Sequence, residues 1–456
     1  MERKGNKYFF GLGTVGRDML YSLVSMYLLF YLTDILNLPD STMWWMAGIL
    51  TVLRVFDAVN DPIMGVIVDN TRTRYGKFKP WIVIGAVLAS VLTVLMFTDL
   101  GLSGALYIVL FAIFYLLWDV SFGANDIAYW SMLPALTLDQ NEREEIGAFA
   151  RICANVGMYI VVVGILPLTN MLSEAVGSKT TGWFIFAVAV AVLLLAFQAF
   201  TIFGVKEKKG VFKQEETTTI RGMVAAIFKN DQLLYTAIAM ALFMIGYVTT
   251  TSFGVYFFKY SFKNENMYSV FAGILGVSQL AALSVFPVFS KRYSRKKLYT
   301  ASTIFVVIGY IIFFFSPMNM IPIGIAGILI FIGQAFIQLL MLMFLADTIE
   351  YGQWKSGKRN ESVTFSIQPF INKIGGAIAN GIVGMTVIIS GINAAVTPDD
   401  VTETGLLIMK MSMLILPLIF IVAGYLLYLA KYKIDKDMFD NIVAELKQRG
   451  DISEGL

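Results

Sequence analysis

The sequence predicts an all-α membrane protein with about twelve transmembrane helices in two pseudo-symmetric six-helix bundles. Three observations carry this prediction. The chain of 456 residues is 57% hydrophobic and only 15% charged, whereas soluble proteins carry about 25% charged residues. Apolar runs recur that reach the roughly 18 residues a helix needs to cross a bilayer. One polar, highly charged segment, VKEKKGVFKQEETTTIRG, divides these runs into two groups of six.

The predicted spans follow one another with short loops. In the first half we expect helices over about 8–35, 42–69, 81–98, 104–135, 147–172 and 182–204. In the second half we expect them over about 232–260, 267–289, 298–316, 321–347, 362–390 and 405–430. The corresponding regions are a first bundle (1–205), a cytoplasmic central loop (206–231), a second bundle (232–430) and a tail (431–456). Two six-helix halves are a common plan of secondary transporters.

The composition excludes several classes of function. Histidine is absent, which excludes the usual general base, the HExxH metal site and the Ser-His-Asp triad. The single cysteine, Cys153, excludes an internal disulfide and a multi-cysteine metal site, and we interpret it as a packing residue. The net charge of +3 is too small to indicate nucleic acid as a partner. We therefore expect neither an enzyme nor a cofactor, and we infer no obligate protein partner; membrane lipid surrounds the chain.

The distribution of lysine and arginine predicts the orientation. Most of these residues fall in the loops on one side, including the basic loop after the second span and the segment KRYSRKK, whereas the opposite loops hold only Lys179, Lys259 and Lys263. By the positive-inside rule, both termini and the central loop face the cytoplasm of a plasma or inner membrane. In the tail, apolar residues from Ile434 to Leu446 recur at helical spacing. This pattern predicts an amphipathic helix lying along the membrane or the protein.

Three oxygen-bearing side chains inside the second predicted helix give the sharpest functional signal. Asp57, Asn60 and Asp61 are spaced to share one helix face, at about 12 to 18 Å from the nearer helix end. Carboxylates at that depth are expensive and usually functional. Hard cations take oxygen ligands, so these residues predict a site for Na⁺, Li⁺ or H⁺. Pro62 follows directly and loosens the helix at this point, which frees backbone carbonyl groups. The structural alternative is an Arg54–Asp57 bridge beside a protonated Asp61.

Polar residues of the first and fourth predicted helices suit a sugar. Arg17 and Asp18 lie near the middle of the first helix, where they either bond ligand hydroxyls or lock helix packing. Asp126 and Trp130 share a face of the fourth. A carboxylate grips sugar hydroxyls and an indole covers the apolar face of the ring; the alternative for Trp130 is a lipid-facing aromatic.

Two more cations lie inside predicted helices. Arg151 enters the fifth helix and needs a buried acid or a ligand; Asp126 is the candidate by depth. Lys373 is the only charge well inside the eleventh helix, and the acids that it needs lie in the first half. This placement predicts contact between the halves across a central cavity, where Gln368 adds a polar contact or an ordinary interhelical hydrogen bond.

The cytoplasmic loops carry charges of both signs. The segment GVIVDNTRTRYGKFKP has the glycine, acidic and basic residues of a tight turn. Near the end of the tenth helix, four residues suit ion pairs between the halves that break as the protein changes state: Asp347, Glu350, Arg359 and Glu361. Solvated loops are the alternative, because exposed ion pairs contribute little.

Several of these segments together resemble a known family. GRDM, FDAVNDPIMG, VDNTRTRYGKFKPW, DIAYW followed by SMLP, ADTIEYG and SIQPFINK are similar to the glycoside–pentoside–hexuronide:cation symporters. This is the family of melibiose permease, within the major facilitator superfamily, and the resemblance covers nearly the whole chain. It implies twelve helices in two bundles, a sugar site between them, a cation site beside it in the first bundle, and alternating access.

Carried over position by position, the resemblance implies roles for individual residues. Those that look like sugar-binding residues are Asp18, Asp126, Trp130 and Arg151, with Arg17 in place of a family lysine. Those that look like cation ligands are Asp57, Asn60 and Asp61, with Asp126 between the two sites. Lys373 resembles the lysine that reaches both sites from the second bundle.

The chain also departs from the family pattern. Where melibiose permease has a threonine one turn before the aspartate of the fourth helix, this chain has Gly123. The loss of a hydroxyl ligand favours protons over sodium. Pro369 and Gln338 replace other cavity-lining side chains, so melibiose itself is not implied. We expect a symporter that couples uptake of a glycoside, pentoside or hexuronide to a monovalent cation; the alternative is a lipid or lysolipid transporter on the same fold.

Overall fold

The computed structural model describes residues 2–102, 104–206, 219, 224, 227–395 and 397–452. The chain folds into two compact units. The first comprises Met1–Met223, Asn360–Ser366 and Gly450–Leu456, and the second comprises Val224–Arg359 and Ile367–Arg449. The side chain of Arg54, for which a bridge to Asp57 is one prediction, and most of the predicted central loop lie outside the described residues.

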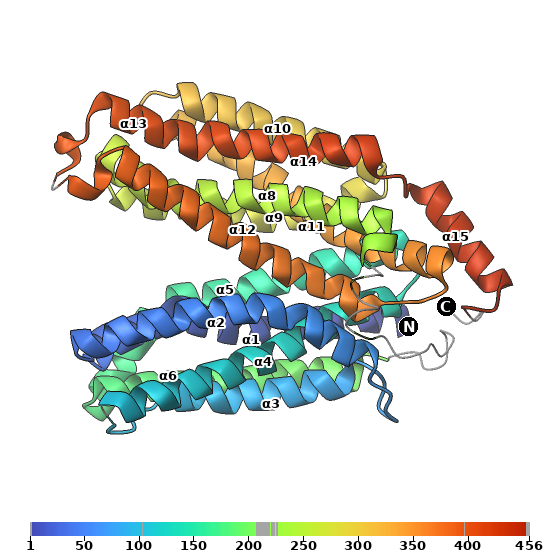
Figure 1. Cartoon of the computed structure of the whole chain (residues 1–456), viewed down its shortest axis with the longest axis horizontal. Helices are drawn as coiled ribbons and strands as arrows, with labels where there is room; N and C mark the ends of the chain where they lie inside the picture. Colours follow the sequence, from blue (N-terminus) through green and yellow to red (C-terminus); the bar gives the residue numbers. More distant parts are fainter. Residues whose placement is uncertain are drawn as a thin grey trace. The chain divides into compact units, whose positions relative to one another are not determined.

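The first unit is a bundle of long helices (Figure 1). In chain order they are α1 (Glu2–Phe30) with the π-helical segment η1 (Tyr31–Ile35), α2 (Asp40–Asp69), α3 (Lys79–Met96), α4 (Gly104–Leu136), α5 (Gln140–Val176) and α6 (Lys179–Ala199) with the π-helical segment η2 (Phe200–Gly204). Helix α1 packs against α5 and α6, and α4 packs against α2 and α3.

The second unit repeats this plan. Its elements are α8 (Asp231–Tyr256) with η3 (Phe257–Ser261), α9 (Asn266–Ser290), α10 (Arg295–Phe315), α11 (Met320–Ser356), α12 (Glu361–Ile389) from Ile367 onward, the 3-10 turns η4 (Ile392–Ala394) and η5 (Pro398–Asp400), α13 (Glu403–Lys410), η6 (Met411–Ile415), α14 (Leu416–Lys431) and α15 (Lys436–Gln448). Helices α13 and α14 are continuous through η6. In each half, the first and the last long helix carry a π-helical segment, which supports the predicted repeat.

The predicted fold class is confirmed. Within the described ranges, ten helical stretches are long and apolar enough to cross a membrane, and α1 and α2 are two more long helices. Three boundaries differ clearly from the prediction. Helix α1 begins at Glu2, α5 begins at Gln140 instead of near residue 147, and α11 continues to Ser356 instead of ending near Asp347. The extension of α11 is tolerated because arginines contact its buried carboxylates at Asp347 and Glu350.

Helix ends follow the local chemistry of capping residues. Asp139 accepts a hydrogen bond from the Glu142 amide at the start of α5, and Asn319 accepts one from the Ile321 amide at the start of α11. Both helices are 37 residues long and both end at a glycine in the left-handed region. Such caps satisfy backbone groups that have no partner inside the helix.

The tail helix α15 packs on α11 within the second unit. Its apolar side chains Phe439, Ile442 and Leu446 are buried, and Trp354 of α11 donates its indole N–H to Glu445 Oε2 at 2.6 Å. Of the two predicted positions for an amphipathic tail, the structure therefore supports packing on the protein.

Glycines bring α1 directly against its neighbours. A Cβ atom built on Gly157 of α5 would lie 2.2 Å from the Val15 carbonyl oxygen, and one built on Gly16 would lie 2.6 Å from the Leu193 carbonyl oxygen of α6. Small residues at such contacts let membrane helices approach closely. The backbone of α1 is therefore held from two sides immediately before Arg17.

Gly157→Ala is expected to destabilise the first unit, because its methyl group would displace the backbone of α1. Overpacking of this kind costs about 1–3 kcal/mol. Gly381→Ala is the matched control: nothing lies within 4 Å of its added Cβ, and alanine favours the helix. The thermal midpoint of the purified variants should fall for Gly157→Ala and stay level or rise for Gly381→Ala. Equal midpoints would contradict the close α1–α5 contact.

Candidate functional site

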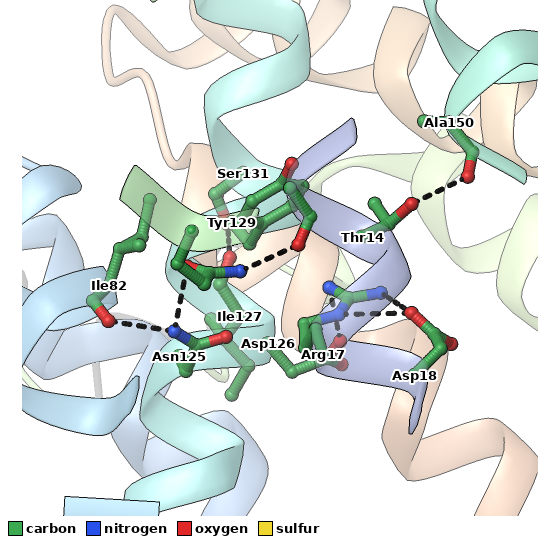
Figure 2. A network of polar contacts seen from close by, with 12 residues as sticks. Thr14, Arg17, Asp18, Ile82, Asn125, Asp126, Ile127, Tyr129, Ser131 and Ala150 are labelled. Carbon is green, nitrogen blue, oxygen red and sulfur yellow. Dashed lines mark hydrogen bonds and ion pairs between the residues drawn. The ribbon is translucent and has the colours of Figure 1, made fainter. Parts of the chain in front are cut away.

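A buried arginine of α1 joins two carboxylates in the first unit. Arg17 Nη2 lies 3.0 Å from Asp18 Oδ2, and its Nη1 lies 2.9 Å from Asp126 Oδ1 on α4 (Figure 2). The Arg17 side chain is 3% exposed, whereas Asp18 and Asp126 are 26% and 25% exposed. The guanidinium therefore fixes both carboxylates from behind, and oxygen atoms of both carboxylates remain accessible to hydroxyl groups of a ligand.

Aromatic rings surround the other faces of this arginine. The Arg17 guanidinium carbon lies 5.0 Å from the ring centre of Tyr129 and 5.2 Å from that of Trp130. Arg151 of α5 lies 4.5 Å from the same Trp130 ring. These are cation–π distances. In this structure, the buried Trp130 indole holds two guanidinium groups close to the carboxylates.

Asp126, the predicted partner of Arg151, interacts with it electrostatically, as does Asp18, but the ion pair of Asp126 is with Arg17. In the part of the chain that the structure describes, Arg17 is the residue that pairs with Asp126, and Arg151 makes no ion pair. The reason is geometric. Asp126 faces α1 across the bundle, whereas Arg151 reaches the indole that follows one turn later on α4. Two alternative roles were predicted for Arg17 and Asp18, binding ligand hydroxyls or locking helix packing. The ion pairs of Arg17 with Asp18 and Asp126 support the packing role and also form the predicted polar cluster.

The carboxylates of α2 face α4 at a glycine. Asn60 and Asp61 are both buried, with Asp61 only 1% exposed. A Cβ atom built on Gly123 would lie 3.5 Å from Asp61 Oδ1 and 3.9 Å from Asn60 Nδ2. Within the described residues, Asn60 Nδ2 is buried without a hydrogen-bond partner. Asp57, one turn earlier, is half-buried. Of the three predicted cation ligands, Asn60 and Asp61 therefore lie at the contact with Gly123.

Helix α4 connects the two groups of charges. Gly123, which faces Asp61 and Asn60 of α2, lies three residues before Asp126, which contacts Arg17. Residues at this spacing share one side of a helix and are about 4.5 Å apart along its axis. The contact of Gly123 with Asp61 and the ion pair of Asp126 with Arg17 therefore lie about one turn apart on α4.

The remaining predicted site residues lie on α12. Lys373 and Gln368 are half-buried within the second unit. A search of the described residues finds no group of three or more His, Cys, Asp or Glu side chains placed to hold a metal ion. The cation ligands predicted from the sequence, two carboxylates and an amide from Asp57, Asp61 and Asn60, stay a prediction.

Comparison with known proteins identifies the family. Residues 9–436 match the family described as "MFS/sugar transport protein". The chain belongs to this family. It is 32% identical over 458 residues to the raffinose carrier protein of Pediococcus pentosaceus, covering 97% of this chain and 72% of that one. It is also 32% identical to the lactose permease of Leuconostoc lactis (96% and 71% covered), and 26% identical to the isoprimeverose transporter of Lactiplantibacillus pentosus (83% and 79% covered).

The predicted membership in the glycoside–pentoside–hexuronide:cation symporters is confirmed, and with it a multi-pass transporter and not an enzyme. Solved structures agree on the fold. A proton:xylose symporter of the major facilitator superfamily matches with a TM-score of 0.64 at 13% identity, covering 96% of this chain and 98% of that one. A fucose:proton symporter of E. coli matches with a TM-score of 0.62 at 13% identity, covering 92% and 97%.

The basic loop of the transporter holds the start of α12 within the first unit. Lys77 Nζ lies 2.6 Å from Asp69 Oδ1 and 3.2 Å from Glu361 Oε2. Asp69 also accepts hydrogen bonds from the backbone N–H groups of Ser362 and Val363, at 2.9 and 2.8 Å. Burial lowers the pKa of Lys77, but the carboxylates of Asp69 and Glu361 outweigh it, so this pKa lies above its ordinary value. The carboxylate caps a helix N-terminus, where negative charge is favourable.

The other predicted ion-pair residues have partners inside the second unit. Arg295 contacts Asp347, and Arg359 Nη2 lies 3.2 Å from Glu350 Oε1. These described pairs are buried within one unit. The alternative that these residues lie in solvated loops therefore does not hold for Asp347, Glu350 and Arg359. Pairs between the halves stay a prediction.

The structure adds residues that the sequence reading missed. Tyr129 contacts Arg17, and its hydroxyl lies 3.0 Å from Thr201 Oγ1. Asn125 donates to the Ile82 carbonyl and to Gln198 Oε1. Asn125 and Tyr129 both belong to the motif NDIAYW, which also contains Asp126. Their polar groups close to Asp126 in the sequence were the signal that could have identified them.

Proposed function

We propose that this transporter takes up a sugar together with a monovalent cation by alternating access. One observation carries the proposal: on the same side of α4, Asp126 meets the carboxylate–guanidinium cluster of α1 and Gly123 meets the buried carboxylate of α2. A cation that neutralises charge at Asp61 changes the field at Asp126. Cation binding therefore favours sugar binding, and by linkage the sugar favours the cation by the same factor.

The sugar site uses the accessible oxygen atoms of Asp18 and Asp126. Each carboxylate is held by Arg17, so it accepts hydroxyl hydrogen bonds without losing side-chain entropy on binding. Arg17 itself is almost completely buried and acts through the two carboxylates. Relatives at 32% identity are named for raffinose and lactose, so we propose an oligosaccharide containing a galactoside unit as the substrate class.

The flanking residues complete this assignment. Arg151 is half-buried and donates to sugar oxygens, while Trp130 fixes its guanidinium. Arg17 and Arg151 both lie over the Trp130 ring. A sugar ring can therefore stack on this indole only if one of the two arginines moves. Lys373 and Gln368 contribute from α12 in the sugar-bound state.

The cation site consists of Asp57, Asn60 and Asp61, with Asp126 one turn along α4 from Gly123. An aspartate that is 1% exposed in a membrane helix is costly as an anion. A proton or a bare cation relieves that cost. The absence of a hydroxyl at Gly123 favours H⁺ over Na⁺ or Li⁺. The basic loop that contains Lys77 supports a cytoplasmic location for both termini, because lysine and arginine are enriched in cytoplasmic loops.

The proposal is tested by binding heats of raffinose, lactose, a xyloside and a glucuronide to purified protein, with and without sodium, at two pH values. Asp126→Asn should weaken binding of the sugar that binds wild type by about two orders of magnitude, as expected when a buried charge partner is removed. Asp119→Asn is the matched control. It removes a buried carboxylate two turns earlier on α4 and should leave the affinity unchanged.

Two outcomes would contradict this assignment. Undiminished sugar affinity in a folded Asp126→Asn variant would remove Asp126 from the site. Binding of amphiphiles, with no binding of any sugar, would instead support a lipid or lysolipid transporter.

Gly123→Ser is expected to create or strengthen a sodium response. An added Cβ would lie in ordinary contact with Asp61 Oδ1, at 3.5 Å, so the hydroxyl has room to serve as a further oxygen ligand. Sodium should then raise sugar affinity about tenfold more than in wild type, the size of one charge-assisted contact. Gly123→Ala adds the same carbon without the oxygen and should show no gain. An equal sodium response in both variants would reject a ligand at this position.

A further inference from the structure

Two buried amides join four helices of the first unit behind the charged cluster. Asn125 Nδ2 donates to the Ile82 carbonyl of α3 at 2.8 Å and to Gln198 Oε1 of α6 at 3.3 Å. Gln198 Nε2 donates in turn to the Gly13 carbonyl of α1 at 3.0 Å. Asn125 and Gln198 are 1% and 0% exposed. Both hydrogens of the asparagine amide are thus used, one for each neighbouring helix.

This amide bridge ends on the two helices that carry the charged pair. Asn125 directly precedes Asp126, and the two side chains point to different sides of α4, toward Ile82 and toward Arg17 (Figure 2). Gly13 lies four residues, or about one turn, before Arg17 on α1. The register between α1 and α4 is therefore fixed by the amides on one side and by the ion pair on the other.

We propose that Asn125 and Gln198 are positioning residues for the Arg17–Asp126 pair. Neither faces the accessible carboxylate oxygens, and neither touches the ligand. They set the rotation of α4 and its height against α1, so that Asp126 meets the Arg17 guanidinium at 2.9 Å in the geometry that a sugar recognises. Without the bridge, α4 loses the two Asn125 hydrogen bonds that hold its rotation, and the pair forms in poorer geometries.

Glycine contacts support this tight arrangement. A Cβ atom built on Gly85 of α3 would lie 2.8 Å from Asn125 Cβ, and one built on Gly13 would lie 2.6 Å from the Tyr129 hydroxyl. The helices around the bridge are therefore in backbone-level contact. Small residues at these contacts offer little steric interlock, so the hydrogen bonds of the bridge contribute to holding the rotation of α4.

The second unit holds a corresponding bridge, which supplies a matched control. Gln334 of α11 donates to the Tyr310 hydroxyl of α10 at 3.5 Å. Tyr310 contacts Thr250 of α8, which donates to the Met413 carbonyl in η6 at 3.1 Å. These helices occupy the same places in the second half as α4, α3, α1 and α6 occupy in the first. No residue in this second bridge supports Asp126.

The first test uses stability and needs no ligand. Thermal midpoints are measured for Gln198→Met, Asp126→Asn and the double variant. If the bridge positions Asp126, the Arg17–Asp126 ion pair is already weakened in the Gln198→Met protein. Asp126→Asn should then lower the thermal midpoint of that protein by less than half of the amount by which it lowers the midpoint of wild type. Gln334→Met, which removes an equally buried amide, should be additive with Asp126→Asn. If Gln198→Met does not fold, Asn125→Ser cuts the same bridge from α4.

The second test measures binding of whichever of raffinose, lactose, a xyloside or a glucuronide binds wild type, and so rests on the proposed function. Gln198→Met should weaken that affinity about three- to tenfold, the size of one lost hydrogen bond, whereas Gln334→Met should leave it unchanged.

Additive midpoints for Gln198→Met and Asp126→Asn, or an equal affinity loss in Gln334→Met, would overturn the positioning role. If wild type binds none of these sugars, the proposed function fails, and the stability comparison decides the positioning role alone.

Discussion

The structure of the first unit depends on the burial of one arginine. A charged side chain inside a membrane helix is stable only with partners, and Arg17 has two carboxylates and two aromatic rings around it. Removing one partner of such a group costs far more than the pair contributes. The packing of α1 through Gly16 and Gly157 delivers the guanidinium to this position, and the cluster in turn leaves the carboxylates partly exposed. Helix packing and ligand recognition are thus one arrangement.

Charge balance explains why a cation and a sugar belong together. Arg17, Arg151, Asp18 and Asp126 sum to zero formal charge, so their cluster needs no further ion. The acids of α2 add negative charge at a buried contact with Gly123 of α4. In the proposed mechanism, a monovalent cation or proton binds at this contact. Because α4 carries both contacts, we propose that the two binding events affect each other through this helix.

Much of this arrangement was predictable from sequence for physical reasons. Twelve spans follow from the lengths of apolar runs, and the shared face of Asp57, Asn60 and Asp61 follows from helical periodicity. The ion pair between Arg17 and Asp126 did not follow, because depth along a helix does not fix its rotation, and rotation decides that Asp126 faces Arg17. The roles of Asn125 and Gln198 were also hidden. An amide in an apolar helix is consistent with many partners, and only the assembled bundle shows that these two meet.

The cytoplasmic end shows the same limit. The sequence VDNTRTRYGKFKP indicates a tight basic turn, and the structure confirms a compact loop with Lys77 between two carboxylates. That Asp69 would cap a helix nearly 300 residues later in the chain could not be read from local pattern. Long-range pairing of this kind needs the packed fold.

The coupling between cation and sugar is tested most directly by linkage in the unmodified transporter. Raffinose or lactose affinity would be measured across a range of pH and sodium concentration, together with the protons that the protein takes up or releases when the sugar binds. The account predicts that one cation raises sugar affinity and that the sugar raises the affinity for that cation by the same factor. Sugar affinity that is independent of both pH and sodium, with no proton taken up or released, would contradict it.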